Sequence, residues 1–103
     1  SHTHSGLDIA APRGTPIKAA AAGTVTYSGN AGDGYGNYVV IAHTNGVQTV
    51  YAHCSQLLVS KGQTISQGEV IAKVGSTGNS TGNHLHLEVR KNGITYNPQN
   101  YVY

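Results

Sequence analysis

Several histidines of this 103-residue chain occur in patterns that can bind a metal ion or move protons. His84-Leu85-His86 lies in an alternating polar and apolar run typical of a β-strand, which puts both imidazoles on one face, about 6.5–7 Å apart. A catalytic zinc ion usually takes three nitrogen or oxygen ligands from the protein and leaves a position for water. His4 and Asp8 are candidates for the missing ligands, and His53, at the end of another predicted strand, offers a further imidazole.

Each of these patterns also has an ordinary structural explanation. A lone His-x-His on a strand is more often a polar face than a pair of ligands, and a histidine four residues before an aspartate is common. Glu88 shares the face of His84 and His86, where it either orients a ligand or is solvated, and we favour solvation. His43, just before an Asn-Gly turn, is expected to have a structural or solvent-exposed role.

Short β-strands separated by turns must position these residues. Helical periodicity is weak throughout, whereas turn residues recur along the chain. Asn45-Gly46 and Asn92-Gly93 predict two hairpins, because Asn-Gly accepts the positive φ angles of a type I′ turn. The pattern predicts an antiparallel all-β fold in one domain that spans residues 1–103.

Strand alternation sorts the side chains onto two faces. In the run 84–90, Leu85, Leu87 and Val89 form an apolar face, and the histidines lie on the other. In the run 47–54, the same alternation puts His53 on the face of Tyr51 and directs Cys54 away from it. We therefore do not expect Cys54 to act as a nucleophile beside His53.

The composition excludes several classes of protein. A net charge of +2 and a charged fraction of 10% are too low for a nucleic-acid surface or a polybasic membrane anchor. One cysteine excludes an internal disulfide and a multi-cysteine zinc ribbon. No run approaches 18 apolar residues, so no membrane-spanning segment is expected. The chain opens on Ser1-His2 without an export signal, as expected of an excised or processed domain.

The combination of motifs resembles the LytM/lysostaphin-type zinc metallopeptidases of the bacterial cell wall. The resemblance covers essentially the whole chain, and the motifs occur in the family's order. The matching segments are HSGLDIAAP at 4–12 with GTPI at 14–17, AAAGTV at 20–25, YGNYVVI at 35–41 with His43, YAH at 51–53, GSTGNSTG at 75–82 leading into HLH at 84–86, and Asn97-Pro98.

The resemblance implies a fold, a metal and an activity. The fold is a curved antiparallel sheet with a β-sandwich-like (barrel-sandwich) core and an open groove. His4, Asp8 and His86 would bind one Zn²⁺ per chain, and His53 and His84 would assist attack by a zinc-bound water, one as general base and one as oxyanion stabiliser. The substrates would be peptidoglycan cross-links or stem peptides, outside the cytoplasm, with no nucleic acid and no membrane insertion of this domain.

Two other functions compete with this one. A catalytically silent scaffold of an envelope complex would have the same fold, although silent members usually lose ligands and this chain keeps the full set. A carrier or phosphotransfer domain would leave His4 and Asp8 without a purpose, and no carrier lysine is visible. The resemblance begins three residues before His4. Longer members of the family supply one side of the groove from upstream sequence, so the groove of this fragment is expected to be incomplete. The partners expected besides peptidoglycan peptides are a missing segment of the parent chain or an envelope protein.

Overall fold

The protein is built from β-strands, as seen in a computed structural model that describes residues 2–3, 6–78, 82–91 and 94–96. The strands are β1 (His2–Thr3), β2 (Gly6–Ala10), β3 (Pro16–Lys18), β4 (Gly23–Asn30), β5 (Asn37–Ala42), β6 (Val47–Leu57), β7 (Thr64–Ile65), β8 (Val70–Val74), β9 (His84–Lys91) and β10 (Ile94–Tyr96). Within the described residues, no helix is long and apolar enough to cross a membrane.

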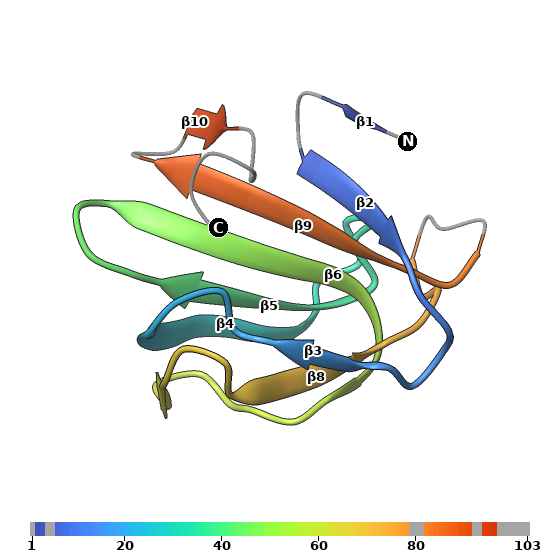
Figure 1. Ribbon diagram of the computed structural model, residues 1–103, viewed down its shortest axis with the longest axis horizontal. Coiled ribbons are helices and arrows are strands. Elements are labelled where there is room, and N and C mark those ends of the chain that lie inside the picture. Colours follow the sequence, from blue (N-terminus) through green and yellow to red (C-terminus); the bar gives the residue numbers. More distant parts are fainter. Residues whose placement is uncertain (1, 4–5, 79–81, 92–93, 97–103) are drawn as a thin grey trace.

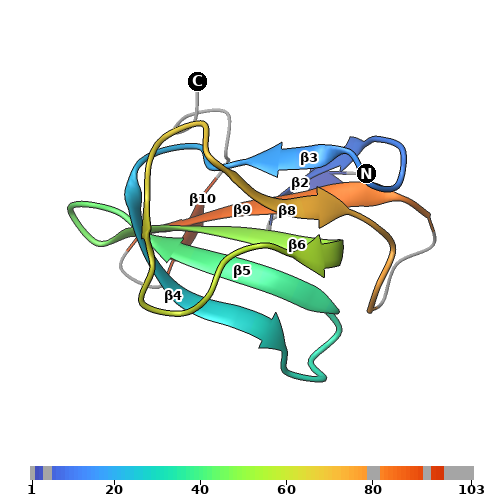
Figure 2. The same ribbon diagram turned by 90° about the horizontal axis from the view of Figure 1, so that it is seen from below.

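The strands pair antiparallel into one curved sheet that is not closed into a barrel. Its main path runs β1-β2-β9-β6-β5-β4-β7, while β10 pairs with β9, β8 with β6, and β3 with β8 (Figure 1). β3 and β8 form a second layer, which lies below the long strands in Figure 1 and across them in the view from below (Figure 2). The predicted all-β, antiparallel, sandwich-like fold is therefore confirmed.

The hydrophobic core lies between the long strands and the layer of β3 and β8. Tyr51 and Ile41 from the long strands pack in one cluster with Ile17 from β3 and Ile71 from β8. Fully burying an aliphatic side chain of this size contributes about 1.5–3 kcal/mol. This packing occupies one face of β6 and β9 and leaves their other face available for polar side chains.

The hairpin predicted at Asn45-Gly46 is present between β5 and β6. Asn45 and Gly46 have φ angles of 60° and 75°, as the two central residues of a type I′ turn require. Asn92-Gly93 lies outside the described residues, but the flanking strands β9 and β10 pair with Ile94 opposite Lys91. The Asn45-Gly46 turn thus fixes the register in which β5 pairs with β6.

Cys54 is a buried core residue. Its side chain packs with the apolar cluster, and burial raises the pKa of its thiol to about 12 because a thiolate would lose its hydration there. A thiol with such a pKa is almost entirely protonated at neutral pH and is a weak nucleophile. The expectation that Cys54 takes no part in catalysis agrees with this environment.

Candidate active site

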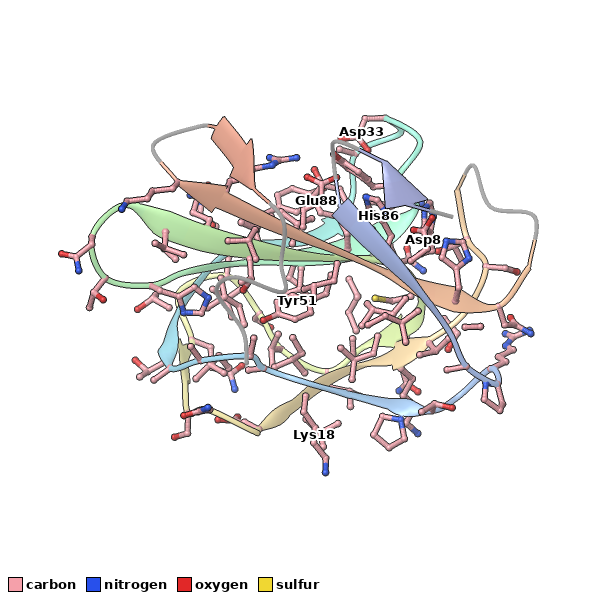
Figure 3. The ribbon with its side chains drawn as sticks, turned by 45° about the horizontal axis from the view of Figure 1, so that its top comes forward. Asp8, Lys18, Asp33, Tyr51, His86 and Glu88 are labelled. Atoms are coloured by element: carbon pink, nitrogen blue, oxygen red, sulfur yellow. The ribbon has the colours of Figure 1, made fainter. Side chains whose placement is uncertain are left out.

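The register between β2 and β9 brings together two of the predicted metal ligands. Asp8 pairs directly with His86, and Ala10 pairs with His84. The Oδ1 atom of Asp8 lies 2.6 Å from Nδ1 of His86 and 3.5 Å from Nε2 of His84. Figure 3 shows Asp8, His86 and Glu88 on one side of the sheet and Tyr51 on the other. Strand alternation therefore predicted the face of the two β9 histidines correctly.

His53 reaches this face through an irregularity in β6. Tyr51 pairs with Val39 and Cys54 pairs with Asn37, so two residues of β6 face one residue of β5. His53 has a φ of 62°, a left-handed conformation that is uncommon outside glycine and asparagine. Its ring centre lies 5.0 Å from that of His84 and 5.9 Å from that of His86.

The prediction that His53 shares a face with Tyr51 is therefore wrong. Regular alternation would have turned His53 toward the core, where Tyr51 lies. The bulge reverses the alternation after Ala52, so that His53 joins the β9 histidines and Cys54 enters the core. The prediction that Cys54 points away from His53 holds, although for a different reason.

Two loops hold His53 in this conformation. Its backbone N–H donates to the carbonyl oxygen of Tyr35 at 2.9 Å, and its Nδ1 lies 2.7 Å from the carbonyl oxygen of Thr77. The Thr77 hydroxyl donates in turn to the carbonyl of Cys54, the next residue of β6, at 2.8 Å. Contacts from the segments before β5 and after β8 thus compensate for the backbone strain at His53.

These two loops cross at a pair of glycines. Gly36 and Gly78 both have positive φ angles, of 67° and 74°. A Cβ atom on Gly78 would overlap the backbone nitrogen of Gly36, and a Cβ atom on Gly36 would overlap the backbone of Thr77. The crossing therefore requires glycine for space as well as for conformation.

We expect Gly78→Ala to destabilise the protein by about 1–3 kcal/mol beyond the conformational cost, because overpacking of a close backbone contact forces the two loops apart. Gly62→Ala is the matched control, since Gly62 has a φ of 92° with nothing within 4 Å of an added Cβ. Urea unfolding of both variants separates the two effects. Equal losses of unfolding free energy in the two variants would contradict the close contact.

The site contains oppositely charged groups that shift one another's pKa values. For His86, the hydrogen bond to Glu88 raises the pKa, burial opposes this, and the Asp8 carboxylate adds to the rise. For Asp8, burial opposes ionisation, but the hydrogen bond to His86 and the nearby histidines hold its pKa below the ordinary value. Burial lowers the pKa of His53, so its neutral imidazole is favoured near pH 7.

Backbone carbonyls determine which nitrogens of His53 and His84 carry hydrogen. Nδ1 of His84 lies 2.9 Å from the carbonyl oxygen of Gly82, and Nδ1 of His53 lies against the carbonyl of Thr77. Because a carbonyl only accepts, both neutral rings carry their hydrogen on Nδ1. Their Nε2 atoms are then the nitrogens that can accept a proton.

Glu88 is buried, contrary to the favoured expectation that it is solvated. Its residue exposure is 0%, and its Oε2 atom lies 2.9 Å from Nε2 of His86. Arg90 and Tyr35 also bind its carboxylate, which makes burial of the charge tolerable. Burial opposes ionisation, but these hydrogen bonds hold the pKa of Glu88 below its ordinary value.

The donor set fits a zinc ion as far as the structure describes it. An imidazole nitrogen and a carboxylate oxygen, those of His86 and Asp8, converge from two neighbouring strands, and zinc prefers these ligand types. The third predicted ligand, His4, lies outside the described residues. Among the residues that are described, no three His, Cys, Asp or Glu side chains are grouped as a metal site.

Not every histidine belongs to this site. The ring of His43 lies between the carbonyl of Ala22 and the hydroxyl of Thr49, at 2.7 Å from each. This agrees with the structural role expected for it. The roles of Arg90 and Thr77 were not foreseen, although Arg90 lies on the polar face of β9 by simple alternation.

The chain is similar to known proteins over nearly all its length. The family model described as peptidase family M23 matches residues 2–98. The DD-carboxypeptidase/endopeptidase Mpg of Neisseria meningitidis is 55% identical over 92% of this chain, and the murein hydrolase activator NlpD of Salmonella typhimurium is 42% identical over 96%. The chain spans only 22% and 26% of the lengths of these two relatives.

Solved structures agree with the sequence comparisons. The catalytic domain of lysostaphin from Staphylococcus simulans superposes with a TM-score of 0.89 and 31% identity, over 96% of this chain and 78% of that one. A zinc-containing peptidase from Vibrio cholerae gives a TM-score of 0.86 at 39% identity, over 90% of this chain and 28% of that one. Similarity in fold and in sequence thus points to the same group of proteins.

Proposed function

Because the chain belongs to peptidase family M23, we propose that it is a zinc-dependent endopeptidase that hydrolyses peptide bonds of peptidoglycan cross-links or stem peptides. The observation that carries this proposal is the convergence of Asp8, His86, His84 and His53 from three strands onto one polar face of the sheet. A purely structural domain has no need for three imidazoles and a carboxylate within hydrogen-bond and ring-contact distances.

In this proposal, His86 and Asp8 hold the metal together with His4. When bound, zinc lowers the pKa of a coordinated water and polarises a carbonyl group. The chain itself supplies two proton-handling groups, Nε2 of His53 and Nε2 of His84. One accepts the proton of the attacking water, and the other, once protonated on Nε2, donates a hydrogen bond to the oxygen that becomes negative during attack.

The relatives support the choice of substrate and compartment. One is named as a DD-carboxypeptidase/endopeptidase and another as a murein hydrolase activator, and a further relative in Escherichia coli is named as a lipoprotein. We therefore propose that residues 1–103 form one catalytic domain that works outside the cytoplasm, in the periplasm or cell wall.

Purified peptidoglycan tests this proposal directly. The chain, loaded with one equivalent of Zn²⁺, should release new amino groups and shorter muropeptides. A strong chelator should stop the release, and added Zn²⁺ should restore it. Stoichiometric zinc binding without hydrolysis of any cross-linked wall preparation would contradict the assignment as an enzyme.

The alternative is a scaffold that activates other wall hydrolases. It is favoured by the 42% identity to NlpD, which is named as an activator. An activating domain would stimulate a separate hydrolase equally well with and without zinc. Retention of that stimulation after chelation, together with no hydrolysis by the chain alone, would select this alternative.

A further inference from the structure

Glu88 is a buried carboxylate that accepts hydrogen bonds from several donors. Its Oε1 accepts from Nε and Nη2 of Arg90 at 3.0 and 2.7 Å, and its Oε2 accepts from the Tyr35 hydroxyl at 2.7 Å. The fourth contact, from Oε2 to Nε2 of His86, measures 2.9 Å. A carboxylate with these donors on both oxygens has no place for a proton of its own, so it acts only as an acceptor.

The ring of His86 lies between two carboxylates. Nε2 faces Glu88, and Nδ1 faces Oδ1 of Asp8 at 2.6 Å. A neutral imidazole has one hydrogen and can satisfy only one of them. The other ring nitrogen must direct its lone pair at a carboxylate oxygen.

Burial decides between the two arrangements. The Glu88 side chain is 1% exposed, whereas that of Asp8 is 21% exposed. A lone pair facing Glu88 would leave a buried charge without one of its donors, and water could not replace that donor. A lone pair facing Asp8 costs less, because Asp8 reaches solvent and because the two atoms would both bind a metal ion rather than repel each other.

We propose that Glu88, held by Arg90 and Tyr35, is a positioning residue that keeps the hydrogen of His86 on Nε2 and so directs the Nδ1 lone pair toward Asp8 as the metal-binding atom. This inference rests on the proposed function for the nature of the metal. A carboxylate that accepts a hydrogen bond from a histidine ligand, without binding the metal itself, fixes both the tautomer and the orientation of that histidine.

Tyr35 also fixes the plane of the His86 ring. The two rings stack with centres 6.1 Å apart and planes inclined by 25°. Arg90 binds the Tyr35 hydroxyl at 2.8 Å, so the three residues that surround His86 on this side hold one another in place. Because the Tyr35 carbonyl also accepts the backbone N–H of His53, one residue supports both the metal-binding and the proton-handling histidine.

Long-range ¹H–¹⁵N NMR of the histidine rings in the whole chain tests the proposal. In metal-free protein, at a pH where the ring is neutral, we expect His86 to carry its hydrogen on Nε2. In Glu88→Leu, Asp8 is the carboxylate that still faces the ring among the described residues, so we expect the hydrogen to move to Nδ1. Zinc binding to that variant should weaken 10–100-fold, since the hydrogen then blocks the binding nitrogen.

Two further variants keep the test decisive. Glu88→Gln retains a carbonyl oxygen that accepts from Nε2, so it should keep the wild-type tautomer and most of the zinc affinity even if Glu88→Leu fails to fold. Glu69→Leu is the matched control, because among the described contacts the Glu69 side chain accepts a hydrogen bond only from the backbone N–H of Ser66. It should leave the His86 spectrum and zinc binding unchanged.

The outcomes separate this proposal from the proposed function. Hydrogen on Nδ1 in the neutral, metal-free wild type would overturn the positioning role, even in a protein that binds zinc and hydrolyses wall material. An unchanged tautomer in a folded Glu88→Leu variant would overturn it as well. Hydrogen on Nε2 that moves to Nδ1 in that variant supports the positioning role, even if no peptidoglycan is hydrolysed.

Discussion

Replacement of Asp8 by asparagine is expected to abolish both zinc binding and wall hydrolysis while the protein stays folded. Asp8 supplies the carboxylate that faces Nδ1 of His86, and an amide oxygen is a poor zinc ligand beside an imidazole. Its side chain is 21% exposed, so solvent can reach the amide that replaces the carboxylate. Elemental analysis of the purified variant should show less than about a tenth of the wild-type zinc. Loss of a residue that only hydrogen-bonds to a metal ligand weakens metal affinity about 10–100-fold, and loss of a direct ligand should weaken it more.

His86→Ala should have the same effect on zinc at a larger cost in stability. Removal of the imidazole takes one donor from the buried carboxylate of Glu88, and loss of a hydrogen bond to a charged group costs about 1.5–3 kcal/mol. His43→Ala is the control, because that ring is bound to Ala22 and Thr49 and not to the site. His43→Ala should bind as much zinc as the wild-type protein. Full zinc occupancy in folded Asp8→Asn and His86→Ala would contradict the proposed metal site.

The face that carries the proposed metal ligands was largely predictable because it depends on local alternation. His84 and His86 are two residues apart on a regular strand, so their common face follows from the geometry of any β-strand. Asp8 was already a candidate ligand beside His4, the resemblance to the LytM/lysostaphin-type enzymes supported it, and the match to peptidase family M23 confirms that resemblance. The register of β2 against β9 explains why a residue 78 positions away meets His86.

The positions of His53 and Glu88 were not predictable in this way because distant contacts determine them. The left-handed backbone at His53 depends on the Thr77 carbonyl, 24 positions along the chain. The burial of Glu88 depends on Tyr35, 53 positions away, and on Arg90. Side chains alternate between the two faces of a strand only while its pairing is regular. Where a tertiary contact stabilises a bulge, the alternation is reversed beyond it.

The second large effect is expected in variants that still bind zinc but no longer hydrolyse the wall. His84→Ala and His53→Asn should each reduce hydrolysis by about 10²–10⁴-fold, the range typical of a lost proton-transfer group. Both should bind zinc with nearly wild-type affinity, because neither is a proposed ligand. Asparagine is chosen at position 53 because it tolerates the left-handed φ of 62°, which separates loss of the imidazole from backbone strain.

The double variant distinguishes one shared step from two independent ones. The ring centres of His53 and His84 lie 5.0 Å apart, so both can reach the same reacting group. If they act on one proton transfer and its developing charge, the double variant should lose little more activity than the poorer single variant, because residues that act as a unit are not additive. Fold-losses that multiply, measured as kcat/KM on one muropeptide, would assign them to separate steps. Wild-type hydrolysis by either zinc-loaded single variant would remove that histidine from the proposed mechanism.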